Sequence, residues 1–299
     1  MDYIVFCEEI KKKIAEKTGY KTKIIDVLKN NNLTLKAISI LEESSNMSPQ
    51  IYMENFYDRY LNNVSGIDLD DIAESVIAFY KKYKIDSIKS DYFYNFEDLK
   101  DDVHYKIINA DRNKKLLKSV PHEKFLDLAK VYIVNIKLPD SSIGTVLVND
   151  NMMNIWKVDT ADLEEAASKN LEKEDVVFQN IADMVSSIVL ENNIEGFDMD
   201  DIDDNVFMYV LTNMDKCFGV RLLLRKNLLQ NIAKKLDSDL IILPSSLHEA
   251  LILKERYKND VENLRKMVME VNDSVVDMQD FLSDNIYFYN RIENRLEIL

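Results

Sequence analysis

The chain has 299 residues, 46% of them hydrophobic, which predicts about two domains of roughly 150 residues with full cores. Only five glycines and four prolines occur, and this excludes long flexible linkers and low-complexity segments. The 53 acidic and 38 basic residues give a net charge of −15, which disfavours direct binding of nucleic acid or anionic membranes, because phosphate binding needs clustered Lys and Arg.

The N-terminal residues and the cysteines favour a cytoplasmic protein. The segment MDYIVFCEEIKKK lacks a basic start and has too short an apolar run for a signal peptide. Nowhere do about 18 apolar residues follow one another, so we expect no membrane span and no membrane partner. Cys7 and Cys217 are expected to be buried free thiols rather than a disulfide.

Hydrophobic periodicity predicts helices around a hairpin in the first part of the chain. Asn30 to Asn32 are expected to form its turn, because Asn tolerates positive φ. Asp68 is expected to cap a helix. The predicted elements are a helix at 2–17, strands at 24–28 and 33–41, a helix from Glu54, a helix at 69–83 and a strand near 103–108.

A second series of elements is predicted beyond the charged stretch 111–118 and Pro121. It contains strands at 125–138 and 143–148, helices at 151–156, 160–170 and 176–191, an acidic loop at 195–205, a hairpin of 206–212 and 218–224, a helix at 226–236, strands at 240–243 and 250–253, a helix at 257–272, and a hairpin of 286–289 and 296–298.

Hairpins outnumber β-α-β crossovers, which favours an α+β fold with largely antiparallel sheets and helices packed on one face. We expect an N-terminal α+β unit at 1–118 and a C-terminal α+β unit at 119–299. Val27–Leu41 resembles Val210–Leu224, and both patterns predict hairpins that feed a helix. Two related α/β units would explain this similarity, and so would chance.

Hydroxyl, imidazole and carboxylate groups come together between the apolar runs of Leu240–Leu253. One interpretation makes Ser245 or Ser246 a nucleophile, His248 its base and Glu249 the orienting acid. In that case Asp284 or Asp127 would serve as a distant acid.

The same stretch also fits a purely structural role. Alternate residues of an extended chain face opposite ways, so His248 and Glu249 would diverge. Ser246 and Glu249 have the spacing of a capping box, and no G-x-S-x-G elbow surrounds either serine. We therefore favour structural roles, and Ser245, Ser246, His248 and Glu249 remain catalytic candidates only.

No pattern indicates a cofactor or a metal. The acidic run Asp198–Asp204 lacks the Gly and the closing Glu of an EF-hand, so a solvated loop is expected. His104, His122 and His248 are too scattered for a zinc signature, and the few glycines leave no loop that would cradle phosphate.

The motifs SPQIYMENFYDRY, VPHEKFLDLAKVY, YVLTN, LPSSLHEALIL and LSDNIYFYN occur here in one order. In these motifs and their order, the chain resembles a family of uncharacterised proteins of similar length from anaerobic gut bacteria, known only as a domain of unknown function. The resemblance covers nearly the whole chain. It implies no activity, cofactor or partner.

We therefore predict a non-enzymatic cytoplasmic module that binds another protein. The acidity, the absence of a complete catalytic set and the fifteen tyrosines favour this function, although the tyrosines also fit the edge of a core. One alternative is a hydrolase-like enzyme that uses Ser245 or Ser246 with His248 and Glu249. A second alternative is an acidic mimic of nucleic acid. Oligomeric state and sheet order stay open.

Overall fold

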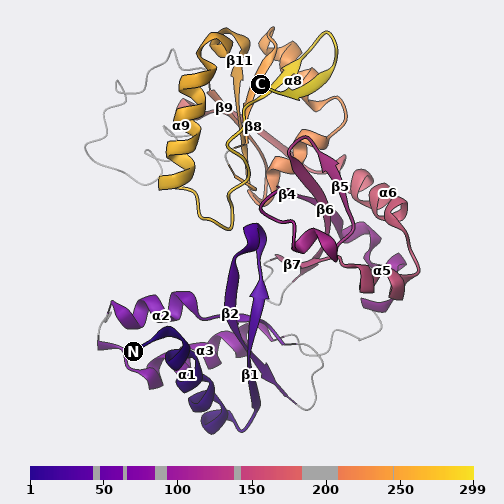
Figure 1. Cartoon of the computed structure of the whole chain (residues 1–299). Coiled ribbons are helices and arrows are strands. Elements are labelled where there is room, and N and C mark those ends of the chain that lie inside the picture. Colours follow the sequence, from indigo (N-terminus) through magenta and orange to yellow (C-terminus); the bar gives the residue numbers. More distant parts are fainter. Residues whose placement is uncertain (43–47, 63–65, 85–92, 138–142, 184–207, 245) are drawn as a thin grey trace.

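The protein has the predicted α+β fold with antiparallel sheets. Figure 1 shows the first helices and strands gathered in a separate lobe below the remainder of the chain. The computed structural model describes residues 1–42, 48–62, 66–84, 93–137, 143–183, 208–244 and 246–299. The predicted acidic loop 195–205 lies outside these ranges.

The N-terminal lobe, residues 1–84, follows the sequence pattern closely. Its elements are α1 Tyr3–Thr18, β1 Lys21–Leu28, β2 Thr34–Leu41, β3 Ile51–Tyr52, α2 Glu54–Leu61 and α3 Leu69–Tyr83. The three strands form an antiparallel sheet in the order β1-β2-β3. Asp68 caps α3 as predicted, accepting from the backbone N–H groups of Asp70 and Asp71.

A four-stranded antiparallel sheet forms the middle of the molecule, with β6 at its centre. Its elements are α4 Phe96–Leu99, β4 Val103–Asn109, β5 His122–Phe125, β6 Leu128–Lys137, β7 Ile143–Leu147, α5 Asp150–Trp156 and α6 Thr160–Leu171. β6 pairs with β4 along one side, and with β5 and β7 along the other.

A six-stranded antiparallel sheet completes the chain in the order β13-β12-β10-β11-β9-β8. The elements are β8 Val176–Asn180, β9 Met208–Asn213, α8 Leu228–Leu236, β10 Leu240–Leu243, β11 Ala250–Lys254, α9 Val261–Ser274, β12 Tyr287–Asn290 and β13 Arg295–Ile298. Short 3-10 helices are η1 Asn30–Asn32, η4 Lys100–Asp102, η5 Leu116–Lys118, η7 Gly219–Leu224 and η8 Glu255–Asp260.

Helices cover both faces of the six-stranded sheet, whereas we expected them on one. Leu240 and Ile242 of β10 pack in the same cluster as the buried face of α8. Ile241 and Leu243 point the other way and pack in a second cluster with Leu264 of α9. Because successive side chains of a strand point to opposite faces, β10 contributes to two separate cores.

Two predicted elements have a different structure. Residues 176–180 form strand β8 instead of starting a helix, because they pair along β9. In the predicted strand 218–224, residues 219–224 form η7 instead, and Phe218 before them adopts a left-handed φ of 53° that a strand does not allow. Val210–Leu224 is therefore no hairpin, and its resemblance to Val27–Leu41 does not extend to structure.

The buried side chains favour a division of the chain different from the predicted one. One hydrophobic cluster is drawn from residues between Phe6 and Tyr80. Residues from Phe96 to Val120 pack instead in one cluster with the C-terminal sheet. These clusters favour a boundary between residues 84 and 93 rather than at 118, and the two-domain division itself stays a prediction.

The tip of the β1–β2 hairpin joins the N-terminal lobe to the rest (Figure 1). The Asn31 amide donates to the carbonyl oxygens of Met278 and Phe281, both at 2.8 Å. The Asn113 amide, fully buried, donates to the side-chain oxygens of Asn30 and Asn31 at 2.9 and 3.0 Å. The left-handed φ of 59° at Asn31 gives the turn that aims these groups.

Candidate functional site

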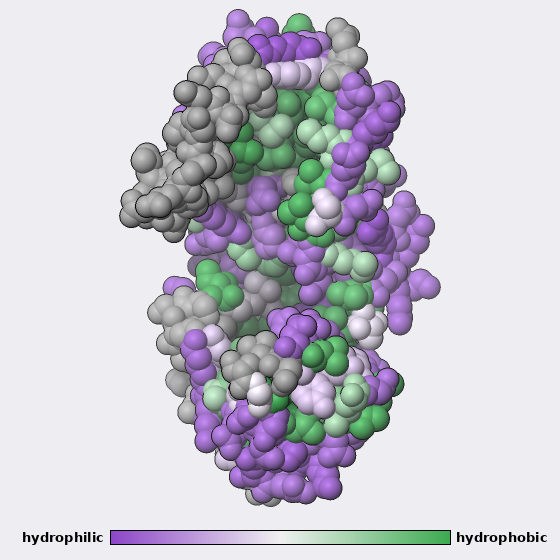
Figure 2. Space-filling model, turned by 90° about the vertical axis from the view of Figure 1, so that its left-hand side faces the viewer, coloured by the Kyte–Doolittle hydropathy of each residue, from purple (hydrophilic) through white to green (hydrophobic). Residues whose placement is uncertain are grey.

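A pocket of about 730 Å³ lies where the β1–β2 hairpin meets the sheet of β4, β6 and β7. This volume falls in the range of roughly 300–1,000 Å³ that is usual for small-molecule sites. Figure 2 shows the surface hollowed between the two lobes. The described lining is Val27–Asn30, Ser48–Gln50, Tyr52, Phe79, Tyr83, Lys106, Ile108, Leu116, Val131, Ile133, Ile136 and Gly144–Leu147. We call this the interlobe pocket.

Lysine supplies the charged groups of the described lining of the pocket. Lys29 and Lys106 contribute ammonium groups, and no Asp or Glu occurs among the described lining residues. Burial, aided by the charge of Lys29, lowers the pKa of Lys106 to about 8. The Lys106 Nζ lies 4.6 Å from the centre of the Phe218 ring, and the Lys29 Nζ lies 4.0 Å from that of Tyr52.

The sheet places Lys106 by strand alternation. Lys106 and Ile133 line the pocket, whereas the neighbouring residues in sequence, Tyr105 and Tyr132, point to the opposite face. There the Tyr132 hydroxyl donates to the Glu164 carboxylate at 2.9 Å, and the Tyr105 hydroxyl to the Glu164 carbonyl at 3.2 Å. These bonds hold one face of the sheet against α6, and Lys106 lies on the opposite face, which lines the pocket.

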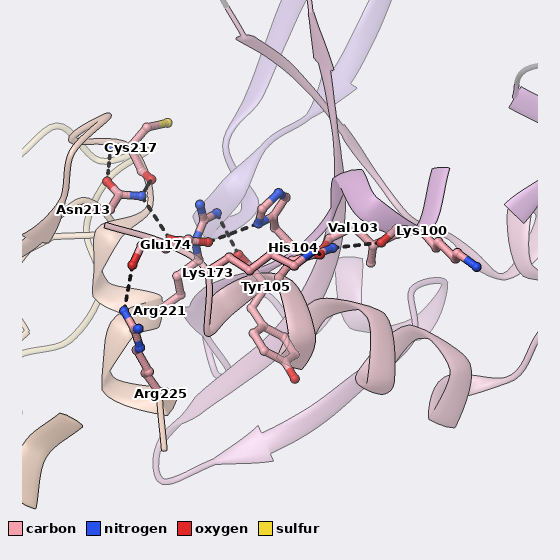
Figure 3. Close-up of polar contacts among 11 residues, drawn as sticks. Lys100, Val103, His104, Tyr105, Lys173, Glu174, Asn213, Cys217, Arg221 and Arg225 are labelled. Carbon is pink, nitrogen blue, oxygen red and sulfur yellow. Dashed lines mark hydrogen bonds and ion pairs between the residues drawn. The ribbon is translucent and has the colours of Figure 1, made fainter. Parts of the chain in front are cut away.

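A buried ion pair lies beside the same strand (Figure 3). Glu174 Oε1 lies 2.9 Å from Arg221 Nε and 3.1 Å from His104 Nδ1. Burial alone would raise the pKa of Glu174, but the hydrogen bond with His104 and the charge of Arg221 together lower it. Arg221 also donates to the carbonyl of Tyr105 at 3.3 Å, so η7 is tied to β4.

Asn213 holds the loop that leads into η7. Its amide donates to the Cys217 carbonyl at 3.0 Å, and its oxygen accepts from the Cys217 N–H at 3.0 Å (Figure 3). Lys216 and Phe218, on either side of Cys217, have left-handed φ values of 50° and 53°. Both thiols are free: Cys7 is buried as expected, whereas Cys217 is only partly buried.

The candidate residues at 246–249 separate into two groups. Ser246 Oγ accepts from the His248 backbone N–H at 3.1 Å and donates to the Glu249 carboxylate at 3.1 Å. No hydrogen bond of the described structure joins Ser246 Oγ to the His248 ring. Ser245 lies outside the described residues. Ser246 is therefore hydrogen-bonded to Glu249, whereas the His248 imidazole has other partners.

The His248 ring lies between two other segments of the chain. Its Nε2 is 3.3 Å from Oδ1 of Asp280, and its Nδ1 accepts from the Phe218 N–H at 3.3 Å. The ring stacks on Phe218, with centroids 5.7 Å apart. Hydrogen bonds with Asp280 and then with the Cys217 side chain raise the pKa of His248 to about 10. We call Cys217, His248 and Asp280 the thiol cluster.

Sequence reasoning selected His248 but missed Lys106, Cys217 and Asp280. These residues come from β4, from the loop before η7 and from the segment before β12, so no short spacing links them to His248. The Gly219 that follows Cys217-Phe218 was the one local signal of an interrupted strand.

The two distant acids lie in other networks. Asp127 accepts from the hydroxyls of Ser283 and Tyr287 at 2.7 and 2.6 Å. Asp284 accepts from the Asn272 amide at 2.9 Å. Both carboxylates join segments of the C-terminal part, and the structure gives neither a bond to His248.

The described residues contain no group of three or more His, Cys, Asp or Glu placed to hold a metal ion. No helix in the same ranges is long and apolar enough to cross a membrane.

Comparison with known proteins gives a family but no function. Residues 3–291 match a family described as "Family of unknown function (DUF5688)". No curated protein and no solved structure matches the chain.

Proposed function

Because the chain belongs to the DUF5688 family, whose function is unknown, we propose a function from its own residues: it binds a small organic carboxylate with an apolar body in the interlobe pocket. The observation that carries this proposal is the charge of the lining. The described lining residues include two lysines and no carboxylate, in a chain whose net charge is −15.

Lys106 supports an anionic ligand. Burial lowers the pKa of Lys106 to about 8 although the charge of Asp280 acts in the opposite direction, so that carboxylate does not offset the cost of burying the ammonium. A carboxylate bound at Lys106 would offset it with a charge-assisted hydrogen bond. Lys29 lies on the hairpin opposite, so a ligand between the two lysines would contact both lobes.

The rest of the lining supports an apolar body. Ile108, Val131 and Ile133 present aliphatic side chains from β4 and β6, and Leu116 adds another. Pockets of this kind combine a large apolar wall with a few polar groups that orient the ligand. A medium-length aliphatic chain with one carboxylate fits both parts of the lining.

Calorimetric titration with decanoate, decylamine and decanol at pH 7 tests the proposal. We expect decanoate to bind and the other two to bind at least about tenfold more weakly, a difference of about 1.4 kcal/mol. Lys106→Met should weaken decanoate binding by at least the same factor, while Lys23→Met, an exposed lysine on β1, should leave it unchanged. Equal binding of decanoate and decanol, or undiminished binding to Lys106→Met, would contradict the proposal.

The prediction of a non-enzymatic module that binds another protein stays beside this proposal as a prediction. The same holds for the hydrolase-like and nucleic-acid-mimic alternatives. Small-ligand binding is preferred because it is the one of these functions for which a pocket with matching charge is described.

A further inference from the structure

We propose that the interlobe pocket receives the C-terminal residues of an extended apolar peptide, whose backbone pairs with the outer edge of β7 and whose carboxylate binds at the pocket lysines. This inference rests on the proposed function, because it names the class of carboxylate that the pocket would take. The observation that carries it is the position of the pocket along a strand edge that has no second partner strand among the described residues.

The pocket lies beside the edge of β7. The four consecutive residues Gly144–Leu147 all line it. Successive side chains of a strand point to opposite faces, so a cavity on one face touches every second residue. On β4 and β6 the lining follows that rule, with Lys106 and Ile108 on one strand and Val131 and Ile133 on the other. On β7 it does not, so there the pocket adjoins the backbone. Figure 1 shows β7 on the side of its sheet nearest to the N-terminal lobe.

The ladder with β6 leaves backbone groups of β7 pointing outward. The Val148 N–H donates to the Tyr132 carbonyl at 2.9 Å, and Val146 lies two residues earlier in the same register. In an antiparallel pair every second residue bonds to the neighbouring strand, and the residues between point their N–H and C=O groups away from it. Val146 therefore faces β6, whereas Thr145 and Leu147 present their backbone groups to the outer edge.

The side chains of β7 do not protect this edge. Native proteins commonly block a free edge with charged side chains or proline. The strand Ile143–Leu147 contains neither, whereas β13, at one end of the six-stranded sheet, has Arg295 and Glu297. An unprotected edge beside a pocket of about 730 Å³ can receive an extended chain by strand addition, in which main-chain hydrogen bonds provide affinity.

The charge of the lining selects one end of the peptide. Lys29 and Lys106 are the charged residues of the described lining, so a terminal carboxylate would find partners there and a terminal ammonium would not. The aliphatic groups of Ile108, Val131 and Ile133 would contact the peptide side chains. Four residues of extended chain measure about 13 Å, which matches the four residues of β7 in the lining. A C-terminal tetrapeptide with aliphatic side chains meets all of these conditions.

Calorimetric titration of the full chain at pH 7 with acetyl-Thr-Val-Thr-Leu tests the proposal. Two N-methylated forms are compared with it, one methylated on both threonine nitrogens and the other on the valine and leucine nitrogens. Alternate N–H groups of a paired strand point to its neighbour. One methylated peptide should therefore bind at least about tenfold more weakly than the parent, and the other should stay within about threefold of it. The C-terminal amide of the parent should also bind at least about tenfold more weakly.

Proline at the edge of β7 provides a second readout. Thr145→Pro removes an outward N–H, a position at which edge strands tolerate proline, and should weaken peptide binding by at least about tenfold. Ile298→Pro is the matched control. The Leu299 N–H donates to the Ile286 carbonyl at 2.9 Å, so the Ile298 N–H also points outward, on a strand outside the described lining. This variant should leave peptide binding unchanged.

Thermal unfolding shows whether each proline variant folds, and the methylated peptides test the pairing on the unaltered chain. Equal affinities of the two methylated peptides, or undiminished binding of the parent peptide to folded Thr145→Pro, would overturn the peptide as ligand. Decanoate binding would then still support the proposed function. Equal binding of the acid and its amide would instead overturn the carboxylate on which both proposals rest.

Discussion

The Nε2 nitrogen of His248 lies 3.3 Å from Oδ1 of Asp280, and this contact ties the loop between β10 and β11 to the segment before β12. Asp280, followed by Cys217, raises the pKa of His248 from an ordinary 6.5 to about 10. A raised pKa in the folded state stabilises the protein fully below pH 6.5, and the contribution is lost as the pH rises through about 10.

Asp280→Asn is therefore expected to lower the pKa of His248 and to cost stability at neutral pH. The loss should stay below about 1 kcal/mol, because both side chains are about a third exposed and solvent screens the pair. It should vanish as the pH rises through about 10. Titration of the His248 ring by NMR checks the shift, with the His122 signal as control. An unchanged His248 titration would contradict the contact.

Arg221→Met should destabilise the protein by about 3–5 kcal/mol in urea unfolding, because it leaves the buried Glu174 carboxylate without its cation. Arg221 is 5% exposed in its side chain. The control Arg295→Met removes an arginine that is 61% exposed and should cost no more than about 0.5 kcal/mol. Similar losses for the two variants would contradict a buried pair.

Gly219→Ala is expected to be more harmful than Gly19→Ala. A Cβ at Gly219 would lie 2.3 Å from Thr212 Oγ1 and 2.8 Å from the Asn213 nitrogen, so the turn must shift, at a cost on the order of 3 kcal/mol. Gly19 has open space but a φ of 73°, which costs alanine about 1–2 kcal/mol. Chemical unfolding ranks the two, and the reverse order would show that the turn adapts freely.

Ser246→Ala should cost about 1 kcal/mol of stability, as the loss of a helix cap does, since Ser246 bonds both the His248 N–H and Glu249. A serine-directed fluorophosphonate should leave the wild-type protein unlabelled. Stoichiometric labelling at Ser245 or Ser246 that His248→Ala abolishes would instead support the hydrolase-like alternative.

Lys106→Met should stabilise the protein at pH 7 by on the order of 1–3 kcal/mol. The pKa of about 8 lies below the ordinary 10.5, so the folded state binds fewer protons than the unfolded state between these values. The stability of the wild type relative to that of Lys106→Met should therefore rise as the pH increases from 8 to 10.5, so the difference between the two shrinks. Urea unfolding across this range, with Lys23→Met as control, measures the difference.

Local signals predicted most of the N-terminal lobe, because its helices and hairpin are encoded by short-range periodicity, turn residues and the Asp68 cap. Two wrong predictions of secondary structure, at 176–180 and 218–224, arose where distant partners decide the structure. β8 is extended because it pairs with β9, and η7 is held by Arg221 through Glu174, 47 residues earlier. His248 was selected by its neighbours in sequence, but its contacts in space come from segments that no spacing connects.

The N-terminal cluster draws all of its buried side chains from residues before Tyr83, so its core needs nothing that is synthesised later. Chains generally fold domain by domain as they leave the ribosome, with the N-terminal part first. The nascent lobe would then present Asn30 and Asn31 at its tip before Met278 and Phe281 exist to receive them. The hairpin tip can therefore dock onto residues 278–281 only late in synthesis, and the interlobe pocket forms only after the tip has docked.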